Sequence, residues 1–224
     1  MDEAWIALRL TLKVAFVATI INMMIGVCLA YLFASKRFLG KDFLDTILTL
    51  PMVLPPTVLG YYLLVFIGKN GPIGYFLKRY FDINLIFTWQ GAVIAASIVS
   101  FPLVFKTARV AFESLEPQYV QSAKVLGVGD LAIFFRVTLP LAWRGILSGI
   151  LLSFARSAGE FGATLMVAGS IPGKTQTLSI AVYEAVQAGQ DDTANFLVLL
   201  ISIVCMTILL VSGKLAPGRI ASKV

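Results

Sequence analysis

The chain has 224 residues, of which 58% are hydrophobic and 13% charged, and its mean hydropathy is +0.89. Soluble globular domains are about half apolar and a quarter charged, so this composition excludes an ordinary water-soluble domain. The net charge of +6 does not indicate nucleic-acid binding, because the basic residues lie between long apolar blocks and build no basic helix or strand. We therefore expect an all-α polytopic membrane protein with a single domain.

Cysteine and histidine usage excludes several chemistries. The absence of histidine excludes a histidine-based catalytic triad, and with two cysteines it also excludes a structural zinc site. Cys28 and Cys205 lie inside apolar runs, and since a reactive thiolate needs an electropositive, accessible setting, we assign them no function. The start Met1-Asp2-Glu3 lacks a basic region and leads into an apolar run longer than the roughly 7 to 15 residues of a signal peptide, so we expect this segment in the mature protein.

The apolar blocks predict about five membrane spans, since a spanning helix needs about 20 apolar residues. The predicted spans cover approximately residues 14–34, 47–67, 85–105, 145–168 and 196–213. The second contains Pro51, Pro55 and Pro56, which remove backbone donors and bend or break a helix. In a membrane, such breaks occur only where protein or a cavity covers the freed carbonyl groups. An odd number of crossings places the two termini on opposite sides.

Basic residues between the spans are distributed unequally. The richer side carries Lys36, Arg37, Lys41, Lys106, Arg109, Lys124, Arg136, Arg144, Lys214, Arg219 and Lys223. The other side carries Arg9, Lys13, Lys69, Lys78, Arg79 and Lys174. The positive-inside rule then predicts an external N-terminus, a cytoplasmic C-terminus and a main cytoplasmic loop at 106–144. Trp89 and Trp143, near opposite membrane faces, are typical of interfacial anchors.

The predicted cytoplasmic loop contains a motif. From Gln121 it reads Gln-Ser-Ala-Lys-Val-Leu-Gly, followed after nine residues by Val137-Thr-Leu-Pro140. Pro117 predicts the start of a short amphipathic helix, Gly127 its C-cap, and Pro140 the start of the next span. The spacing resembles the EAA loop of ABC-importer permeases, which is Glu-Ala-Ala, three residues, Gly, nine residues and Ile-x-Leu-Pro. An ordinary surface helix is the alternative interpretation.

The match to the EAA loop is partial. Ala123, Gly127, Leu139 and Pro140 agree with the pattern, whereas Gln121 and Ser122 stand in its first two positions and Val137 replaces isoleucine. The resemblance implies that this loop contacts the ATPase subunits.

Three further segments restrict the resemblance to one branch of the ABC-importer permeases. They resemble segments of molybdate permeases, with tungstate and sulfate permeases as relatives. The segments are Leu50-Pro-Met-Val-Leu-Pro-Pro-Thr-Val-Leu-Gly60, Ser100-Phe-Pro-Leu103, and Phe154 to Thr164 followed by Ile171-Pro-Gly173. The resemblance implies a type I ABC-importer permease fold in the bacterial or archaeal plasma membrane. It implies import of an oxyanion, molybdate first and tungstate or sulfate as alternatives, with no cofactor and no catalytic site in this chain.

The resemblance also implies the partners: a second copy of the chain, two cytoplasmic ATP-binding-cassette ATPase subunits and an external substrate-binding protein. A dimer is expected independently, because five helices without an internal repeat cannot easily enclose a polar path for a dianion, whereas two copies can.

Arg156 and Glu160 fall inside the fourth predicted span, where an ionisable residue indicates a functional site by default. Their i, i+4 spacing allows them to pair on one helix face. Either Arg156 guides the anion through the pore, or the pair is neutral and fixes helix packing. We favour packing, because an exposed permanent charge would hold the anion and conduction requires weak binding.

The string from Ala168 to Thr175 fits a relaxed Walker A pattern. A phosphate loop lies between a strand and a helix, whereas this string follows a span and Pro172 lacks an amide, so we expect no ATP binding here. Two other function classes stay open. An ion-coupled secondary transporter would show inverted repeats and several embedded acids, and a membrane enzyme would need a metal cluster, paired carboxylates or a nucleophile with its base.

Overall fold

The structure, a computed structural model, describes residues 2–36 and 38–215. Within these ranges the regular secondary structure is entirely helical. Three members of the predicted basic side, Arg37, Arg219 and Lys223, lie outside the described residues.

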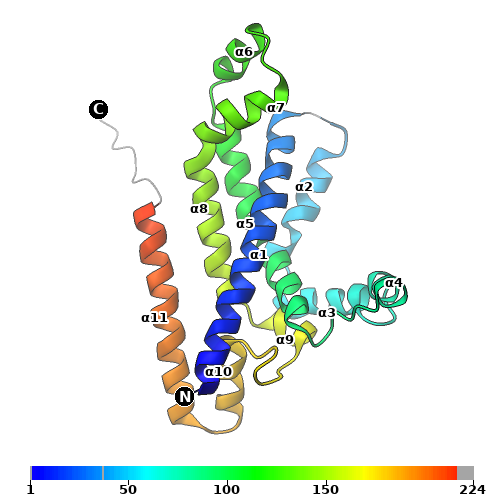
Figure 1. The fold of residues 1–224 in the computed structure, drawn as a ribbon, viewed down its shortest axis with the longest axis vertical. Helices are drawn as coiled ribbons and strands as arrows, with labels where there is room; N and C mark the ends of the chain where they lie inside the picture. Colours follow the sequence, from blue (N-terminus) through cyan, green and yellow to red (C-terminus); the bar gives the residue numbers. More distant parts are fainter. Residues whose placement is uncertain (1, 37, 216–224) are drawn as a thin grey trace.

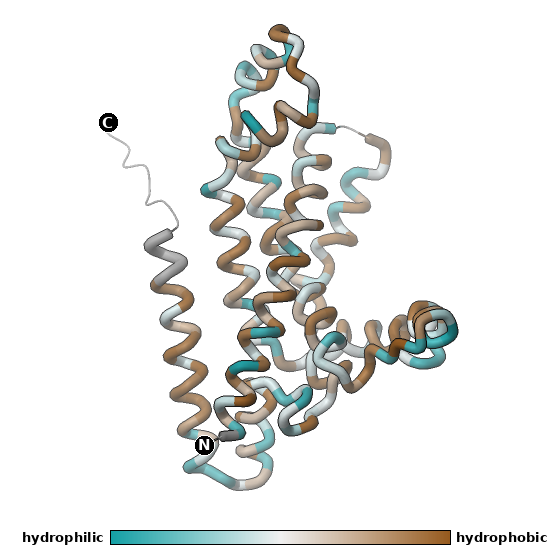
Figure 2. Tube along the Cα trace, viewed as in Figure 1, coloured by the Kyte–Doolittle hydropathy of each residue, from teal (hydrophilic) through white to brown (hydrophobic). Residues whose placement is uncertain are grey.

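The fold is built on long helices that run along one axis (Figure 1). Helices α1 (Asp2–Ser35), α5 (Trp89–Glu113) and α8 (Leu139–Ala158) pack against one another, and α11 (Asp191–Leu215) runs beside them. Figure 2 shows hydrophobic residues along these helices and more hydrophilic residues towards the ends. The described part of the chain has four helical segments long and apolar enough to cross a membrane, or five when one bent pair counts as a span. The predicted polytopic all-α fold is therefore confirmed.

The predicted spans differ from the helices in their bounds. The ranges 14–34 and 196–213 lie within the longer helices α1 and α11. The third helix, α5, begins at Trp89 rather than at residue 85, because Thr88 caps it by accepting a hydrogen bond from the Gly91 amide at 3.1 Å. It then continues past the predicted end at 105 to Glu113.

The second predicted span is not one helix. It consists of α2 (Lys41–Thr49), the 3₁₀ turn η1 (Leu50–Met52) and α3 (Pro56–Ile67), and its two halves are bent by 112°. The predicted break at Pro51, Pro55 and Pro56 is confirmed, since Pro51 lies in the 3₁₀ turn and Pro55 and Pro56 begin α3. Helix α3 and the following α4 (Pro72–Phe81) project sideways from the bundle (Figure 1).

The fourth predicted span, 145–168, is also interrupted. Helix α8 ends at Ala158 and α9 (Gly162–Ala168) begins after a non-helical step at residues 159–161. The continuous helix expected there is wrong, and at the break the Glu160 carboxylate accepts a hydrogen bond from the Ala163 amide in the first turn of α9. Beyond it, α10 (Leu178–Gln187), which the hydropathy did not predict, packs against α11.

The predicted loop 106–144 is mostly helical and shorter than expected. Helix α5 occupies its first part, and α6 (Pro117–Val125) lies at the end of the molecule (Figure 1). Then α7 (Asp130–Ile133) and the π-helical turn η2 (Phe134–Thr138) run into α8 as one helical segment, Asp130–Ala158.

Small residues bring α5 and α8 close together. A Cβ atom on Gly149 would lie 1.9 Å from Thr107 Oγ1, and one on Gly145 would lie 2.5 Å from Ala111 Cβ. Glycines at such positions allow helix backbones to approach in a membrane, where close packing replaces the hydrophobic driving force. The rigid unit that positions the site is therefore the α1–α5–α8 bundle.

Candidate coupling loop and transport pathway

Helix α6 ends in a well-formed Schellman motif. Gly127 has a φ of +76°, its amide donates to the Lys124 carbonyl at 2.9 Å, and the Val128 amide donates to the Ala123 carbonyl at 3.1 Å. This pair of bonds satisfies carbonyls that the helix end would otherwise leave free. The start predicted at Pro117 and the C-cap predicted at Gly127 are thus confirmed, and Gly127 has a left-handed conformation that other residues rarely adopt.

The outer face of this end of the molecule is apolar and uncovered. Val125 is 87% exposed, Leu126 80% and Leu131 78%, whereas Phe135 and Tyr119 are less exposed, at 61% and 47%. We call this surface the loop patch; it comprises Tyr119, Val125, Leu126, Leu131 and Phe135. Of the motif residues on α6, Gln121 and Ser122 are exposed and Ala123 is half-buried. Exposed apolar patches are typical of surfaces that contact a protein or a membrane.

Pro140 lies in the first turn of α8, which confirms the start of a span predicted there, and the helical segment that contains α8 already begins at Asp130. The π-helical turn η2 precedes it, and there the Leu139 amide donates to the Phe134 carbonyl, one residue further back than in an α-helix. A proline has no N–H to donate and crowds the preceding turn, so the wider turn accommodates it. Val137 and Leu139, both half-buried, lie at this adjustment.

The two broken spans meet at their breaks. Gly162 begins α9 and Pro56 begins α3, and a Cβ atom on Gly162 would lie 2.9 Å from Pro56 Cβ and 3.5 Å from the Thr57 amide nitrogen. Non-helical backbone at membrane depth is tolerated where it is buried in protein or lines a water-filled cavity. Discontinuous helices also form the substrate sites of many transporters.

Arg156 and Glu160 form the expected ion pair, with Arg156 Nη1 2.7 Å from Glu160 Oε2. The pair does not lie on one helix face, because Glu160 is in the break after α8. The Glu160 side chain is 1% exposed, and its other oxygen accepts a hydrogen bond from the Ala163 amide at 2.9 Å. Glu160 therefore joins the end of α8 to the first turn of α9.

A buried polar network within the bundle escaped the sequence analysis. Asn22 Nδ2 on α1 donates to Ser100 Oγ at 2.8 Å, to Ser153 Oγ at 3.1 Å and to the Ser97 carbonyl at 3.1 Å. Ser100 Oγ also lies 2.8 Å from Ser157 Oγ. Cross-helix hydrogen bonds of this kind fix the mutual position of α1, α5 and α8.

A second unpredicted cluster ties α2 to α5. Asp45 accepts hydrogen bonds from Lys106 Nζ at 2.8 Å and from Arg109 Nη1 at 2.6 Å, and Arg109 Nε donates to Glu113 at 2.7 Å. Lys106 and Arg109 appeared in the sequence only as part of the basic side, because nothing in the pattern indicates their partner. The cluster fixes the first half of the broken span against the bundle.

The Walker-like string has no phosphate-loop geometry. The amides of Lys174, Thr175 and Gln176 all donate to the Ile171 carbonyl, so these donors are used within the loop itself. The Thr175 side chain is fully buried and accepts from the Ile171 amide at 3.0 Å. A phosphate loop instead turns successive amides towards its ligand.

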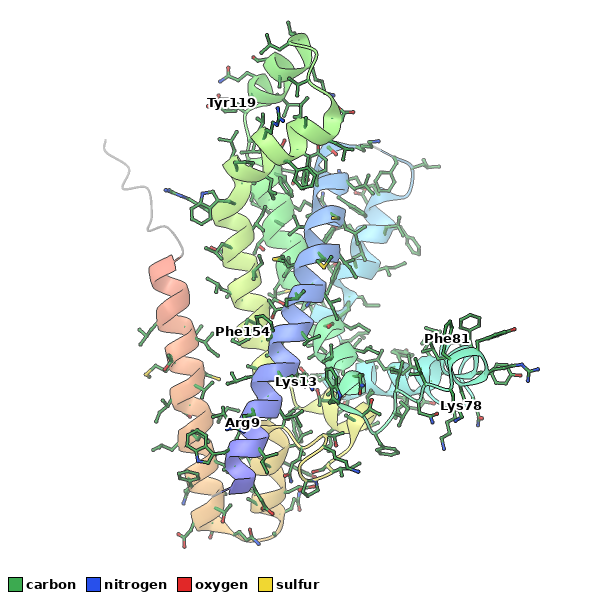
Figure 3. The ribbon with its side chains drawn as sticks, in the orientation of Figure 1. Arg9, Lys13, Lys78, Phe81, Tyr119 and Phe154 are labelled. Carbon is green, nitrogen blue, oxygen red and sulfur yellow. The ribbon has the colours of Figure 1, made fainter. Side chains whose placement is uncertain are left out.

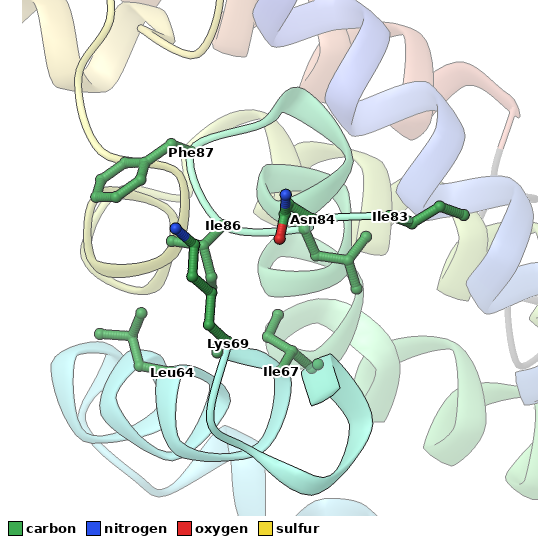
Figure 4. A pocket seen from close by; sticks show the side chains of 10 residues that line it. Leu64, Ile67, Lys69, Ile83, Asn84, Ile86 and Phe87 are labelled. Carbon is green, nitrogen blue, oxygen red and sulfur yellow. The ribbon is translucent and has the colours of Figure 1, made fainter. Parts of the chain in front are cut away.

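Two cavities lie away from the helix breaks. One of about 340 Å³ lies at the corner of α3 and α4, where Lys69 extends past Leu64 towards Ile86 (Figure 4). The other, of about 600 Å³, lies beside the α10–α11 hairpin and is lined by Glu3, Glu184 and Asp192 among others. Among the described residues, no group of three or more cysteine, aspartate or glutamate side chains could hold a metal ion.

Comparison with known proteins identifies the chain. A family described as "Binding-protein-dependent transport system inner membrane component" matches residues 22–220. The chain belongs to this family. It is therefore an inner-membrane, multi-pass component of an ABC-type importer, and its relatives are transport components rather than enzymes.

The chain is similar to permeases for two oxyanions. It is 41% identical over 211 residues to the molybdenum transport system permease protein ModB of Escherichia coli (strain K12), covering 93% of this chain and 92% of ModB. It is 41% identical over 193 residues to the putative molybdenum transport system permease protein YvgM of Bacillus subtilis (strain 168), covering 86% and 85%. It is 38% identical over 181 residues to the sulfate transport system permease protein CysT of Salmonella typhimurium (strain LT2), covering 81% and 65%.

The chain has the same fold as chains in solved ABC transporter structures. The chain matches a bacterial ABC transporter involved in the import of the acidic polysaccharide alginate with a TM-score of 0.74 and 17% identity, covering 99% of this chain and 81% of that one. It matches the MetNI methionine ABC transporter with a TM-score of 0.74 and 16% identity, covering 96% and 95%. The predicted ABC-importer permease fold is confirmed.

Proposed function

We propose that this family member translocates molybdate into the cytoplasm, driven by partner ATPase subunits. The observation that carries the proposal is the 41% identity with the Escherichia coli molybdenum permease across nearly the full length of both proteins. The sulfate permease of Salmonella typhimurium matches over only 65% of its own length, so sulfate ranks second. Tungstate shares the charge and shape of molybdate and is the other alternative.

We place the end that carries α6 in the cytoplasm and the end that carries α10 outside. The basic residues support this orientation. Arg9, Lys13 and Lys78 lie towards the end opposite α6 (Figure 3), and Lys69, Arg79 and Lys174 belong to the same predicted side, which makes six. The predicted α6 side has seven among the residues with described side chains: Lys36, Lys41, Lys106, Arg109, Lys124, Arg136 and Arg144. External substrate-binding protein would then meet the surface around α10.

We propose that the ATPase subunits bind the loop patch. Helix α6 is capped at its C-terminus, and an ion pair of 3.5 Å between Lys124 and Asp130 links it to α7. From Asp130 the helical segment runs without a break to Ala158. When the ATPases displace the loop, α8 would move as a rigid helix and shift the break at Glu160.

We propose that the anion passes along the junction where α3 and α9 begin, and that a second copy of the chain completes the path. Apolar side chains next to the first break are uncovered in the single chain, among them Met52, at 66%, and Val53, at 82%. A second copy covering them would enclose a path between two-fold related breaks, and cyclic dimers are the commonest oligomers. Arg156 and Glu160 then act in joining α8 to α9 rather than in holding the anion.

The substrate assignment is tested with the assembled complex and its cognate binding protein. Binding protein loaded with molybdate, tungstate or sulfate is added to the complex in nanodiscs, and stimulation of ATP hydrolysis is measured. We expect molybdate to stimulate at the lowest concentration. Stimulation by sulfate with no response to molybdate would instead assign the chain to sulfate import.

A further inference from the structure

Helix α4 carries a distinct amphipathic pattern that the transport function does not use. Five of its apolar or aromatic residues recur at i, i+3, i+4, i+7 and i+8; they are Ile73, Phe76, Leu77, Tyr80 and Phe81, and a further aromatic residue, Tyr75, lies outside this series. Tyr75, Lys78 and Arg79 occupy the opposite side of the helix. At 100° per residue the apolar positions form one continuous stripe, which in a soluble helix would face a core.

Four of the five stripe residues are exposed in the described chain, and Leu77 is half-buried. Phe76 is 52% exposed, Tyr80 67% and Phe81 62%. The helix also cannot turn freely to bury them, because its corner with α3 is tight: a Cβ atom on Gly74 would lie 2.0 Å from the Gly68 carbonyl oxygen. The fold therefore holds an aromatic face away from the bundle.

The position of α4 coincides with markers of a membrane surface. Figure 3 shows Lys78 and Phe81 on the projecting arm at about the height of Lys13 along the bundle. Lys13 Nζ lies 3.6 Å from the ring centroid of Trp89, the first residue of α5. Tryptophan and snorkelling lysine side chains gather where the hydrocarbon meets the headgroups. Helix α4 leaves the bundle sideways at this level (Figure 1).

The basic residues of α4 favour lipid, rather than another protein, as the partner that covers the aromatic stripe. Lys78 and Arg79 stand opposite the aromatic stripe, and helices with that division lie in the plane of the interface, with the basic side towards phosphate groups. Lys78 also pairs with Asp82, and its hydrogen bond holds the pKa of the Asp82 carboxyl below its ordinary value. Within the described ranges no carboxylate lies at ion-pair distance from Arg79, which leaves its guanidinium for an anionic partner.

We propose that α4 is an interfacial anchor that inserts its aromatic stripe at the boundary between headgroups and acyl chains, in the leaflet opposite the loop patch. It would fix the depth of the α3 arm, and hence the position of the break at Pro56, relative to the bilayer. The occupant is phospholipid, with Arg79 near its phosphate. A second copy of the chain and bulk water are the alternatives that the test separates.

The test uses the complete permease–ATPase complex in phosphatidylcholine nanodiscs. Phe76→Cys and Phe81→Cys are each made in a Cys28→Ala, Cys205→Ala background and labelled with a small fluorophore. Tyr75→Cys, on the opposite side of α4, is the matched control. Quenching is measured with lipid brominated near the headgroup, with lipid brominated near the chain ends, and with aqueous iodide.

We expect the labels at positions 76 and 81 to lose most fluorescence with the headgroup-proximal bromolipid and little with iodide, and the label at position 75 to show the reverse. Shielding of positions 76 and 81 from every quencher would assign the stripe to a protein contact, and quenching by iodide would place it in water; either result overturns the proposal. Hydroxyl-radical footprinting of the unaltered complex needs no variant. It should oxidise Tyr75 and protect Phe76 and Phe81, and oxidation of both phenylalanines would likewise contradict the proposal.

Discussion

Arg156 lies 2.7 Å from Glu160 across the break that ends α8, and the two partners are unequally buried. The Arg156 side chain is 37% exposed and can reach solvent or headgroups, whereas the Glu160 side chain is 1% exposed. An unpaired charge is therefore costlier at position 160 than at position 156. The same carboxylate also caps α9 through Ala163.

This asymmetry predicts the order of three variants. Arg156→Met strands the buried carboxylate and should reduce assembly of the complex most. Glu160→Gln keeps an oxygen for the Ala163 amide and should be milder, and the double change Arg156→Met with Glu160→Gln should assemble better than Arg156→Met alone. Co-purification of the ATPase and thermal stability in detergent measure this order. Normal assembly of Arg156→Met with uptake abolished would assign Arg156 to the anion path instead.

Substitutions at Gly127 and Ala123 test whether the segment that contains α6 binds the ATPase. No atom lies within 4 Å of a Cβ atom built on Gly127, so a substituent there meets backbone strain and the partner rather than its own chain. We expect Gly127→Asp and Ala123→Glu to insert normally but to lose ATPase binding and substrate-stimulated hydrolysis. Gly127→Asn is the matched control, because asparagine adopts a positive φ at about 1 kcal/mol or less. Normal co-purification of the ATPase with both charged variants would show that this end of α6 does not contact the ATPase.

The close approach of α5 and α8 at Gly149 predicts a packing effect. Gly149→Val should clash with Thr107 and lower stability by about 1 to 3 kcal/mol, the usual cost of overpacking. Gly129→Ala, at a position where a Cβ atom meets nothing within 4 Å, should leave stability unchanged. Thermal unfolding followed by size-exclusion chromatography measures both, and equal stability of the two variants would show that the bundle relaxes at this contact.

The proposed orientation predicts the side of each reporter. A reporter fused after Val224, which lies outside the described residues, should be cytoplasmic. A reporter inserted after Gly189, in the turn between α10 and α11, should be external. A phosphatase active only outside the membrane reads both positions. Location of both reporters on the same side would mean that α11 does not cross the membrane, and would contradict the five-span topology.

The sequence predicted the elements whose signal is local. Uninterrupted apolar runs located α1 and α11, and Pro117 and Gly127 delimited α6, because proline and glycine act on their own turn. The prolines at 51, 55 and 56 predicted a break but not its 112° bend, which depends on what α3 packs against.

The features that were missed depend on distant partners. Asn22 is one polar residue in a long apolar run, and its role follows only from Ser100 and Ser153 on other helices. Glu160 lies four residues after Arg156, which fits a continuous helix as well as the observed break. Hydropathy averaged over a span cannot distinguish these cases, because the average over residues 145–168 stays apolar with or without a break at residues 159–161.

Uptake by a purified complex tests the proposed function most directly. The permease, its ATPase and the cognate binding protein are reconstituted in sealed liposomes, and entry of radiolabelled molybdate is followed with ATP supplied on the side of the ATPase. We predict accumulation that requires ATP and both partner proteins, and that Gly127→Asp, at the end of α6, abolishes. Accumulation driven by an ion gradient without ATP or ATPase would contradict it.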